Sequence, residues 1–194
     1  MAGGPNEMTD WWDDLVEFWM PSDPNRPNEA RRKYYGSKYE VAGRIRPKRI
    51  VEIGVRAGYG AFAMLSAVPD AQYMGIDMDA GTHGGIENGL VHAELLLSRF
   101  QKTEIWVMDS HDIERLPKDI DLIHIDGDHS FTGCFTDLSL ALNSGVHWAL
   151  VDDVDSLAEV RQAHEAWIKA HPQVRVVEEI HDGLRGSALI ELMP

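Results

Sequence analysis

The sequence predicts an α/β protein with a doubly wound, mostly parallel sheet. Two observations lead to this prediction. From residue 49 onward, short apolar runs alternate with stretches of helical periodicity, which is the pattern of parallel strands joined by crossover helices. Near the end of the chain, two further apolar runs are separated only by the segment HDGLRG. A connection this short joins antiparallel strands.

The expected strands are, in chain order, RIVEIG, AQYMGID, TEIWVMD, IDLIHID, HWALVDD, VRVVEEI and SALIEL. The runs before the terminal pair are mostly apolar, so both faces of their sheet are expected to be covered. The helices expected between them span residues 60–68, 86–100, 131–142 and 156–172. Together these elements predict a Rossmann-like, seven-stranded sheet that ends in a C-terminal antiparallel hairpin.

Residues 1–45 differ in character, and we expect them to form an N-terminal helical extension to a domain over residues 46–194. Three tryptophans fall within residues 11–19, and a proline-rich segment follows them. Asn28 is then placed to cap a helix over residues 29–42. The aromatic cluster is expected to pack on the main domain, to cover a substrate pocket or to form a homodimer contact, because so much apolar surface is unstable in water.

Composition indicates which classes of partner are unsuited to the protein and in which compartment it is expected. The net charge of −14 repels phosphate backbones and anionic lipid, so neither nucleic acid nor a membrane is an expected partner. No apolar run approaches the roughly 20 residues of a membrane helix. The N-terminus has no signal-peptide pattern, and Cys134 is the single cysteine. These features predict a cytoplasmic protein without an intrachain disulfide.

A glycine-rich turn follows the first expected strand. The segment from Glu52 to Gly60 reads E-I-G-V-R-A-G-Y-G and contains Gly54 and Gly58. Glycine permits a sharp turn and leaves room for a ligand against the backbone. Such a turn between a strand and a helix is therefore a nucleotide-binding feature. Its spacing matches neither a dinucleotide loop nor a phosphate-binding P-loop. It resembles the S-adenosylmethionine loop of class I methyltransferases, whose sheet also ends in an antiparallel hairpin.

The ends of the next two strands supply further candidate cofactor contacts. Asp77 ends the second strand, roughly 20 residues beyond the loop, where a carboxylate can accept hydrogen bonds from ribose hydroxyls. The third strand runs into Met108, Asp109 and Ser110. The methyltransferase resemblance places this turn beside adenine, with Asp109 accepting from the amino group. The alternative is that Asp109 caps the next helix.

Carboxylates also follow the fourth and fifth strands. Asp126 and Asp128 lie in IDGDH, and Asp152 and Asp153 end the run HWALVDD. Neighbouring strands lie about 4.8 Å apart, so Asp126, Asp152 and Asp153 should converge. Such carboxylates repel unless they share a proton, pair with bases or bind a cation. Since neither motif contains Lys or Arg, we expect a divalent metal ion, Mg²⁺ first. In the alternative, Asp152 or Asp153 caps a helix and Asp128 stabilises a turn.

The segment IHIDGDHSFTGCFTDLSLAL, followed by VDD, resembles the macrocin O-methyltransferase and cephalosporin hydroxylase-like group, whose members methylate hydroxyls of sugars and natural products. The resemblance implies that Asp126, Asp152 and Asp153 hold the metal and that Asp128 is the general base. His129 follows that base and is expected to touch substrate. This chain departs from the group before the fifth strand, where it has SGVH in place of the paired glycine often found there.

The sequence therefore predicts S-adenosylmethionine-dependent methyl transfer to a small-molecule hydroxyl, assisted by a divalent metal. A metal-bound hydroxyl loses its proton more readily than a free one, and Asp128 would accept that proton. Two alternatives remain open. A nicotinamide-dependent oxidoreductase would use the same loop and Asp77, and a non-catalytic protein would bind the cofactor without turnover.

Overall fold

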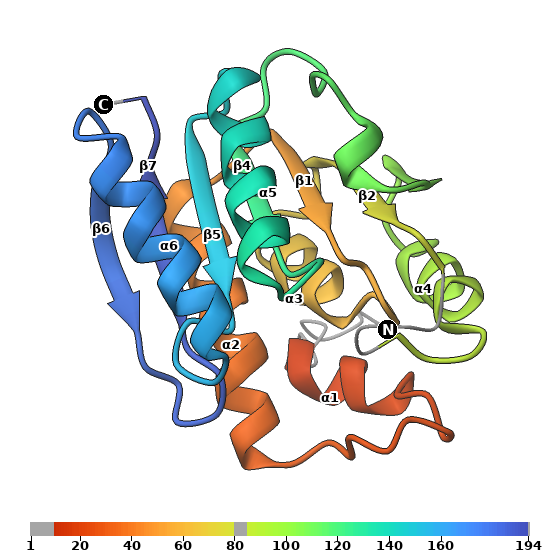
Figure 1. The fold of residues 1–194 in the computed structure, drawn as a ribbon. Coiled ribbons are helices and arrows are strands. Elements are labelled where there is room, and N and C mark those ends of the chain that lie inside the picture. Colours follow the sequence, from red (N-terminus) through yellow and green to blue (C-terminus); the bar gives the residue numbers. More distant parts are fainter. Residues whose placement is uncertain (1–9, 80–84, 194) are drawn as a thin grey trace, which may run out of the picture.

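The computed structural model describes residues 10–79 and 85–193, so residues 1–9 of the predicted extension lie outside the described residues. Its sheet has the order β3-β2-β1-β4-β5-β7-β6, in which only β7 runs opposite to the other strands (Figure 1). The strands are β1 (Arg49–Ile53), β2 (Gln72–Asp77), β3 (Thr103–Val107), β4 (Leu122–Ile125), β5 (Trp148–Asp152), β6 (Arg175–Ile180) and β7 (Ser187–Glu191). The predicted mostly parallel sheet with its antiparallel hairpin is confirmed.

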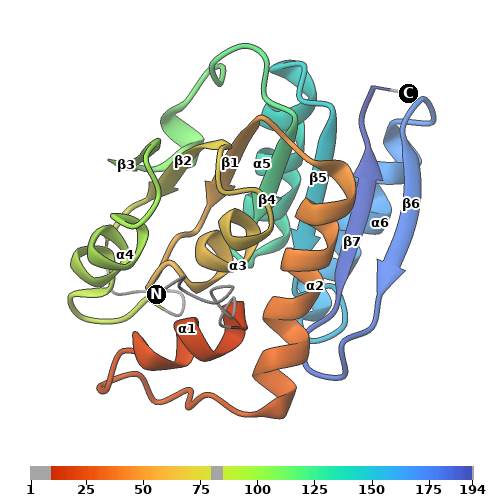
Figure 2. The same cartoon turned by 180° about the vertical axis from the view of Figure 1, so that it is seen from behind.

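Helices cover both faces of this sheet. They are α1 (Trp11–Glu17), α2 (Glu29–Ile45), α3 (Tyr59–Ala67), α4 (Gly89–Leu97), α5 (Phe131–Asn143) and α6 (Ala158–Ala170). Helices α5 and α6 lie on the face toward the viewer in Figure 1, and α2 and α3 lie on the opposite face, seen in Figure 2. Each face has its own buried apolar cluster. This two-sided burial is the reason that the central strands are apolar on both faces.

Strand register brings the candidate acids to one edge of the sheet. Ile53 at the end of β1 pairs with Ile76 on β2 and with Ile125 on β4, and Ile125 pairs with Val151 on β5. The residues that follow these partners are Gly54, Asp77, Asp126 and Asp152. The expected convergence at the carboxyl ends of the strands is therefore present.

Three helices differ in length from the expectation by more than one residue. Helix α6 spans Ala158–Ala170 instead of residues 156–172, and the other two are α4 and α2. The helix expected over residues 86–100 begins only at Gly89, because Ile86 and Gly89 form a turn in which the Gly89 N–H donates to the Ile86 carbonyl at 2.9 Å. Helix α2 begins as expected, with the Asn28 side chain accepting from the Arg31 N–H at 3.0 Å. It extends beyond residue 42 to Ile45.

The N-terminal extension packs directly on α3. Trp19 stacks on Tyr59 with the ring centroids 4.1 Å apart, and Trp12 and Leu15 are buried in the same apolar cluster as the α3 side chains. The apolar surface that suggested a homodimer contact is thus largely covered by the chain itself. Among the described residues, no helix is long and apolar enough to cross a membrane.

Candidate active site

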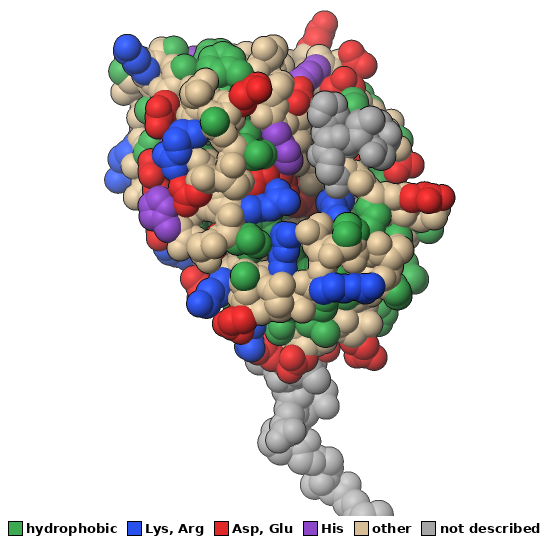
Figure 3. Space-filling model, turned by 60° about the horizontal axis from the view of Figure 1, so that its bottom comes forward, with side chains coloured by type: hydrophobic (Ala, Val, Ile, Leu, Met, Phe, Trp, Pro, Cys, Tyr) green, Lys and Arg blue, Asp and Glu red, His purple; other side chains and the backbone are tan. Residues whose placement is uncertain are grey.

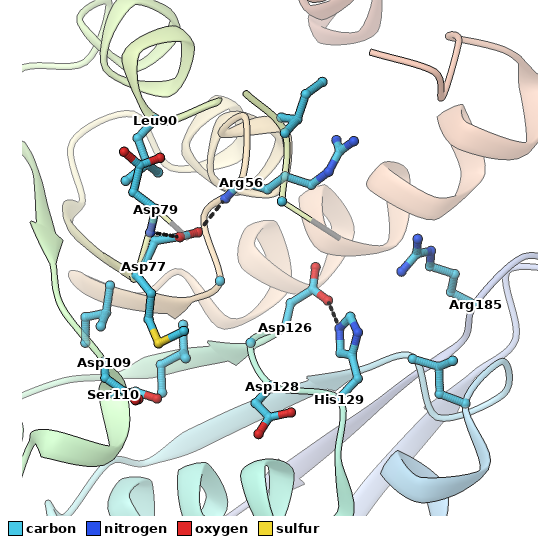
Figure 4. Close-up of a pocket in the computed structure, with 18 of the residues that line it drawn as sticks. Arg56, Asp77, Asp79, Leu90, Asp109, Ser110, Asp126, Asp128, His129 and Arg185 are labelled. Atoms are coloured by element: carbon cyan, nitrogen blue, oxygen red, sulfur yellow. Dashed lines mark hydrogen bonds and ion pairs between the residues drawn. The ribbon is translucent and has the colours of Figure 1, made fainter. Parts of the chain in front are cut away.

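A pocket of about 600 Å³ opens at the carboxyl ends of the parallel strands. Its wall is built by the loops that follow β1, β2, β3, β4 and β5 and by parts of the extension and of the β6–β7 hairpin (Figure 4). Of the residues predicted from sequence to form the site, those that line it are Gly54, Asp77, Met108, Asp109, Ser110, Asp126, Asp128 and His129. The predicted site residues outside this wall are Glu52, Gly58, Gly60, Asp152 and Asp153.

Gly54 and Asp77 shape the glycine-rich turn. Gly54 has φ +88°, and a Cβ on it would lie 2.0 Å from the Asp126 carbonyl oxygen, so only glycine lets the two loops approach. One Asp77 oxygen accepts from the N–H groups of Val55 and Arg56, both at 2.9 Å. Its other oxygen accepts from the Asp79 N–H at 2.8 Å. Because a carboxylate oxygen can accept two hydrogen bonds, this second oxygen keeps room for a ligand hydroxyl.

The expectation that Glu52 contacts the cofactor is not supported by its position. Its side chain is 2% exposed and lies beneath the glycine turn. One carboxylate oxygen accepts from the Tyr73 hydroxyl, and the other lies 2.8 Å from His124 Nδ1. Burial raises the pKa of the Glu52 carboxyl. Glu52 therefore belongs to a buried polar network that supports the turn from below.

Gly58 and Gly60 also serve packing instead of lining the pocket. A Cβ on Gly58 would lie 3.0 Å from the Cβ of Ala93 on α4, and Gly58 has φ +80°. A Cβ on Gly60 would lie 2.6 Å from a carboxylate oxygen of Glu52. These two glycines let α3 and α4 come close to the turn, and their contact with the cofactor stays a prediction.

The turn after β3 reaches the pocket as expected. Met108, Asp109 and Ser110 line it, while one Asp109 oxygen accepts from the His111 N–H at 2.9 Å and so caps a short 3₁₀ helix. Asp109 therefore acts as the cap that the alternative predicted. Its side chain is nevertheless 41% exposed, so it remains accessible to a ligand in the pocket. Ser110 donates to Asp137 at 2.8 Å. Burial raises the pKa of Asp137 to about 6, and sequence reasoning missed this buried acid.

His129 lies between two of the predicted acids. Its Nε2 is 3.1 Å from an Asp126 oxygen and 3.3 Å from an Asp153 oxygen (Figure 4 shows the Asp126 pair). The contact with Asp126 raises the pKa of His129, against the opposing effect of burial. Asp153 also accepts from Arg185 Nη1 at 2.6 Å and from the Ser156 hydroxyl at 2.9 Å. Asp126 is thus the more open of the two carboxylates, with its side chain 23% exposed against 0% for Asp153.

Asp152 does not line the pocket and takes part in a buried ion pair. Lys38 Nζ donates to one of its oxygens at 2.9 Å, with both side chains 0% exposed. Ser187 donates to the same oxygen at 2.8 Å, and the Tyr34 hydroxyl donates to the other. Although burial opposes ionisation, Lys38, His124 and the Tyr34 hydroxyl hold the pKa of Asp152 far below its usual range. Asp152 is therefore already paired with a buried cation, although its oxygen also lies within reach of His124 and Asp126. Its place among the metal ligands stays a prediction.

Two of the three expected metal ligands, Asp152 and Asp153, are paired with cations from elsewhere in the chain. Lys38 comes from α2 and Arg185 from the loop between β6 and β7, whereas the acid motifs themselves contain neither Lys nor Arg. Within the described residues, one group that fits a metal combines His124, Asp126 and Asp152, and it includes the carboxylate held by Lys38. The other combines Asp126, His129 and Asp153, whose ligand atoms lie within 4.8 Å of one another. This second group likewise contains a paired carboxylate, since Asp153 accepts from Arg185, but both Asp126 and His129 line the pocket.

Asp128 has the geometry of a turn. Its two oxygens accept from the Ser130 N–H and the Ser130 hydroxyl, both at 2.9 Å. Ser130 in turn caps α5. The carboxylate of Asp128 points away from the pair formed by Asp126 and His129 (Figure 4). The structure therefore matches the alternative in which Asp128 stabilises a turn. His129, and not Asp128, is the residue in contact with Asp126 and Asp153.

A sequence signal for one of the missed residues is visible in α2. Tyr34, Lys38, Val41 and Ala42 are all buried on this helix and follow the spacing of an apolar helix face. A lysine on such a face requires an acidic partner, because an unpaired buried charge is very costly. The position of Lys38 could therefore have indicated a buried carboxylate, although not which one.

Comparison with known proteins agrees with this geometry. Residues 51–154 match the family described as Methyltransferase domain, which is more than half of the chain. No curated protein matches.

Among solved structures, the O-methyltransferase TomG from Streptomyces achromogenes, in complex with SAM, is 16% identical with a TM-score of 0.64, covering 95% of this chain and 88% of that one. The O-methyltransferase from Bacillus cereus, in complex with SAH, is 15% identical with a TM-score of 0.58, covering 92% and 86%. A putative O-methyltransferase from Klebsiella pneumoniae is 18% identical with a TM-score of 0.62, covering 100% and 92%. These neighbours share the fold, and the family match shows that the chain belongs to the methyltransferase domain family.

Proposed function

We propose that this protein transfers a methyl group from S-adenosylmethionine to a hydroxyl of a small molecule. The observation that carries the proposal is the pocket in which the Gly54 turn, Asp77 and the Asp126–His129 pair share one wall. TomG, which has the same fold, is an O-methyltransferase in complex with SAM. When bound, this cofactor supplies an electrophilic methyl group on a sulfonium.

The nucleoside end of the pocket is assigned to Asp77 and the turn after β3. The open acceptor position of Asp77 suits a ribose hydroxyl, since its other positions are fixed by the N–H groups of the turn. Met108 offers an apolar surface to the base, and Asp109 keeps an exposed carboxylate beside it. These residues bind and orient the cofactor and take no part in proton transfer.

His129 is proposed as the general base. With an Nε2–H directed at Asp126 and Asp153, Nδ1 carries the lone pair that can accept the proton of the acceptor hydroxyl. The two carboxylates orient the ring and stabilise its protonated form, as expected for an imidazole beside acids. Asp128, the base implied by the family resemblance, is held by Ser130 instead.

Metal assistance remains a second arrangement for the same reaction. Asp126, His129 and Asp153 would hold the divalent ion, because their ligand atoms lie within 4.8 Å of one another. A divalent ion there would lower the pKa of the acceptor hydroxyl. His129 cannot bind a metal through Nε2 while that atom carries a proton. The base arrangement therefore requires a protonated Nε2, and the metal arrangement requires an unprotonated one.

The test has a binding part and a turnover part. Calorimetry with S-adenosylhomocysteine and with NAD separates a methyltransferase from the nicotinamide-dependent alternative. Methyl transfer from labelled S-adenosylmethionine is then followed over a panel of hydroxyl compounds, sugars and natural products first, with and without a chelator. Tight binding of NAD alone would overturn the proposal, and cofactor binding without any transfer would favour the non-catalytic alternative. Loss of transfer with the chelator would select the metal arrangement.

A further inference from the structure

The pocket divides its charged side chains between two ends. Asp77, Asp79 and Asp109 lie toward the end assigned to the nucleoside. A group of arginines lines the other side, contributed by α2, by the glycine-rich turn and by the β6–β7 loop: Arg31, Arg56 and Arg185. Figure 3 shows Lys and Arg side chains gathered in the middle of this face beside a hollow. In a chain with a net charge of −14, such a gathering of cations calls for an explanation.

Arg56 and Arg185 are each paired with a carboxylate. Arg56 makes a double contact with Asp23, at 2.6 and 2.9 Å, and Asp23 is fully buried. Arg185 donates to Asp153 through Nη1 at 2.6 Å. Because Asp153 also contacts His129, the Arg185 guanidinium is linked to the proposed base through this carboxylate. These two arginines are therefore fixed in place at the pocket wall.

Arg31 differs from them. Its Nη2 donates to the amide oxygen of Asn25 at 2.7 Å, and no carboxylate of the described residues lies within ion-pair distance of it. It stays partly buried in the pocket wall. It also falls in the first turn of α2, where a positive charge is unfavourable next to the helix dipole. This position lowers helix stability without an internal ion pair to offset it.

Arg31 and Arg185 share a support in the ring of Tyr34. The guanidinium carbons lie 5.9 Å and 5.8 Å from its centroid, and the Tyr34 hydroxyl is fixed by Asp152. Two guanidinium groups therefore lie near one ring at the wall of the pocket, and Lys38 Nζ lies closer to the same centroid, at 3.5 Å. Guanidinium groups bind oxyanions through paired, charge-assisted hydrogen bonds.

We infer that the methyl acceptor carries an oxyanion, a carboxylate or a phosphate, which Arg31 and Arg185 bind while the acceptor hydroxyl lies at His129. The inference depends on the proposed function and adds to it the chemical class of the substrate. The anionic group compensates the charge of Arg31, and Arg185 connects the bound anion with the acids around the base. Neutral hydroxyl compounds of the same shape would lack this anchor.

The test compares matched probes on the full chain saturated with S-adenosylhomocysteine. Calorimetry is run with para-hydroxybenzoate, para-hydroxybenzamide and para-hydroxyphenyl phosphate, which all keep a free phenolic hydroxyl. We expect one of the anions to bind about ten-fold or more tightly than the amide, which is the scale of a charge-assisted hydrogen bond. Whichever anion binds more tightly distinguishes a carboxylate acceptor from a phosphate acceptor.

Variants then assign the preference to Arg31. Arg31→Gln should abolish it while leaving the affinity for S-adenosylhomocysteine unchanged. Arg32→Gln, at the next position on α2 with a side chain 45% exposed, is the matched control and should keep it. Anions that bind no more tightly than the amide, or do not bind at all, would overturn the inference.

Weaker binding of S-adenosylhomocysteine in Arg31→Gln, with the anion preference retained, would also overturn it and would assign Arg31 to the carboxylate of the cofactor. Failure of the unmodified protein to bind S-adenosylhomocysteine counts against the proposed function itself, so the two failures are distinguishable.

Discussion

Lys38 and Asp152 form a fully buried ion pair, with the ammonium nitrogen 2.9 Å from the carboxylate oxygen. The pair joins α2 of the N-terminal extension to the end of β5, at the edge of the sheet where the pocket opens. Ser187 on β7 donates to the same carboxylate. The extension is thereby tied to the last strands of the sheet as well as to α3.

Replacement of Lys38 by methionine should strongly destabilise the protein. Lys38→Met leaves the Asp152 charge buried without its cation, a change that costs about 3–5 kcal/mol in the free energy of unfolding. Urea denaturation measures this loss. Arg44→Met is the control, because the pair of Arg44 with Glu178 is 55% and 42% exposed and should cost less than about 1 kcal/mol. Equal effects of the two substitutions would contradict the importance of the buried pair.

Replacement of Asp77 by alanine should weaken cofactor binding. Asp77→Ala removes the acceptor proposed for a ribose hydroxyl and should lower the affinity for S-adenosylhomocysteine by about 1–3 kcal/mol, as measured by calorimetry. Glu94→Ala, which removes an exposed acid from α4, should leave the affinity unchanged. An unaltered affinity in Asp77→Ala would remove this residue from the cofactor site.

His129 and Asp128 are adjacent in sequence, and we expect opposite effects on turnover when each is replaced. His129→Gln should lower kcat by about 10²–10⁴-fold, the usual contribution of a general base, with cofactor affinity retained. Asp128→Asn should keep most of the activity, because an amide oxygen can still accept from the Ser130 N–H. Steady-state kinetics on the best substrate of the panel provides the measurement. The reverse pattern would restore Asp128 as the base that the family resemblance implies.

His164 should make stability depend on pH. Burial lowers its pKa below 6.5, and neither ring nitrogen has a hydrogen-bond partner among the residues that the structure describes. Because its folded-state pKa lies below the unfolded value, the stabilising contribution is present above pH 6.5 and is lost as the pH falls through the folded pKa. His164→Leu should therefore lose less stability than the unmodified protein between about pH 7.5 and 5.5. Urea denaturation at both pH values measures this difference. His147→Leu is the control, because the His147 side chain is 48% exposed. An identical pH dependence of stability in all three proteins would refute the prediction.

The fold was predictable from sequence because local patterns report which side chains are buried. The apolar runs around Ile50 and Ile123 have covered faces on both sides of the sheet, and this alone produces a run without polar alternation. Asn28 as a cap was equally readable, since it depends on residues three positions apart. The helix expected from residue 86 failed at its start, where the turn at Gly89 lies against the backbone of Arg56, a contact from another part of the chain.

The candidate site was only partly predictable for the same reason. The positions of Gly54, Asp77 and Asp126 at one edge follow from strand order and from a short motif after each strand. The partner of Asp152 does not, because Lys38 is 114 positions away and meets it only when α2 packs against the sheet. Arg185 reaches Asp153 through the hairpin loop in the same way. The sequence by itself determined which strand ends carry the acids, and only the tertiary structure decided which cation neutralises each one, because ion pairing depends on distances between elements that no local pattern encodes.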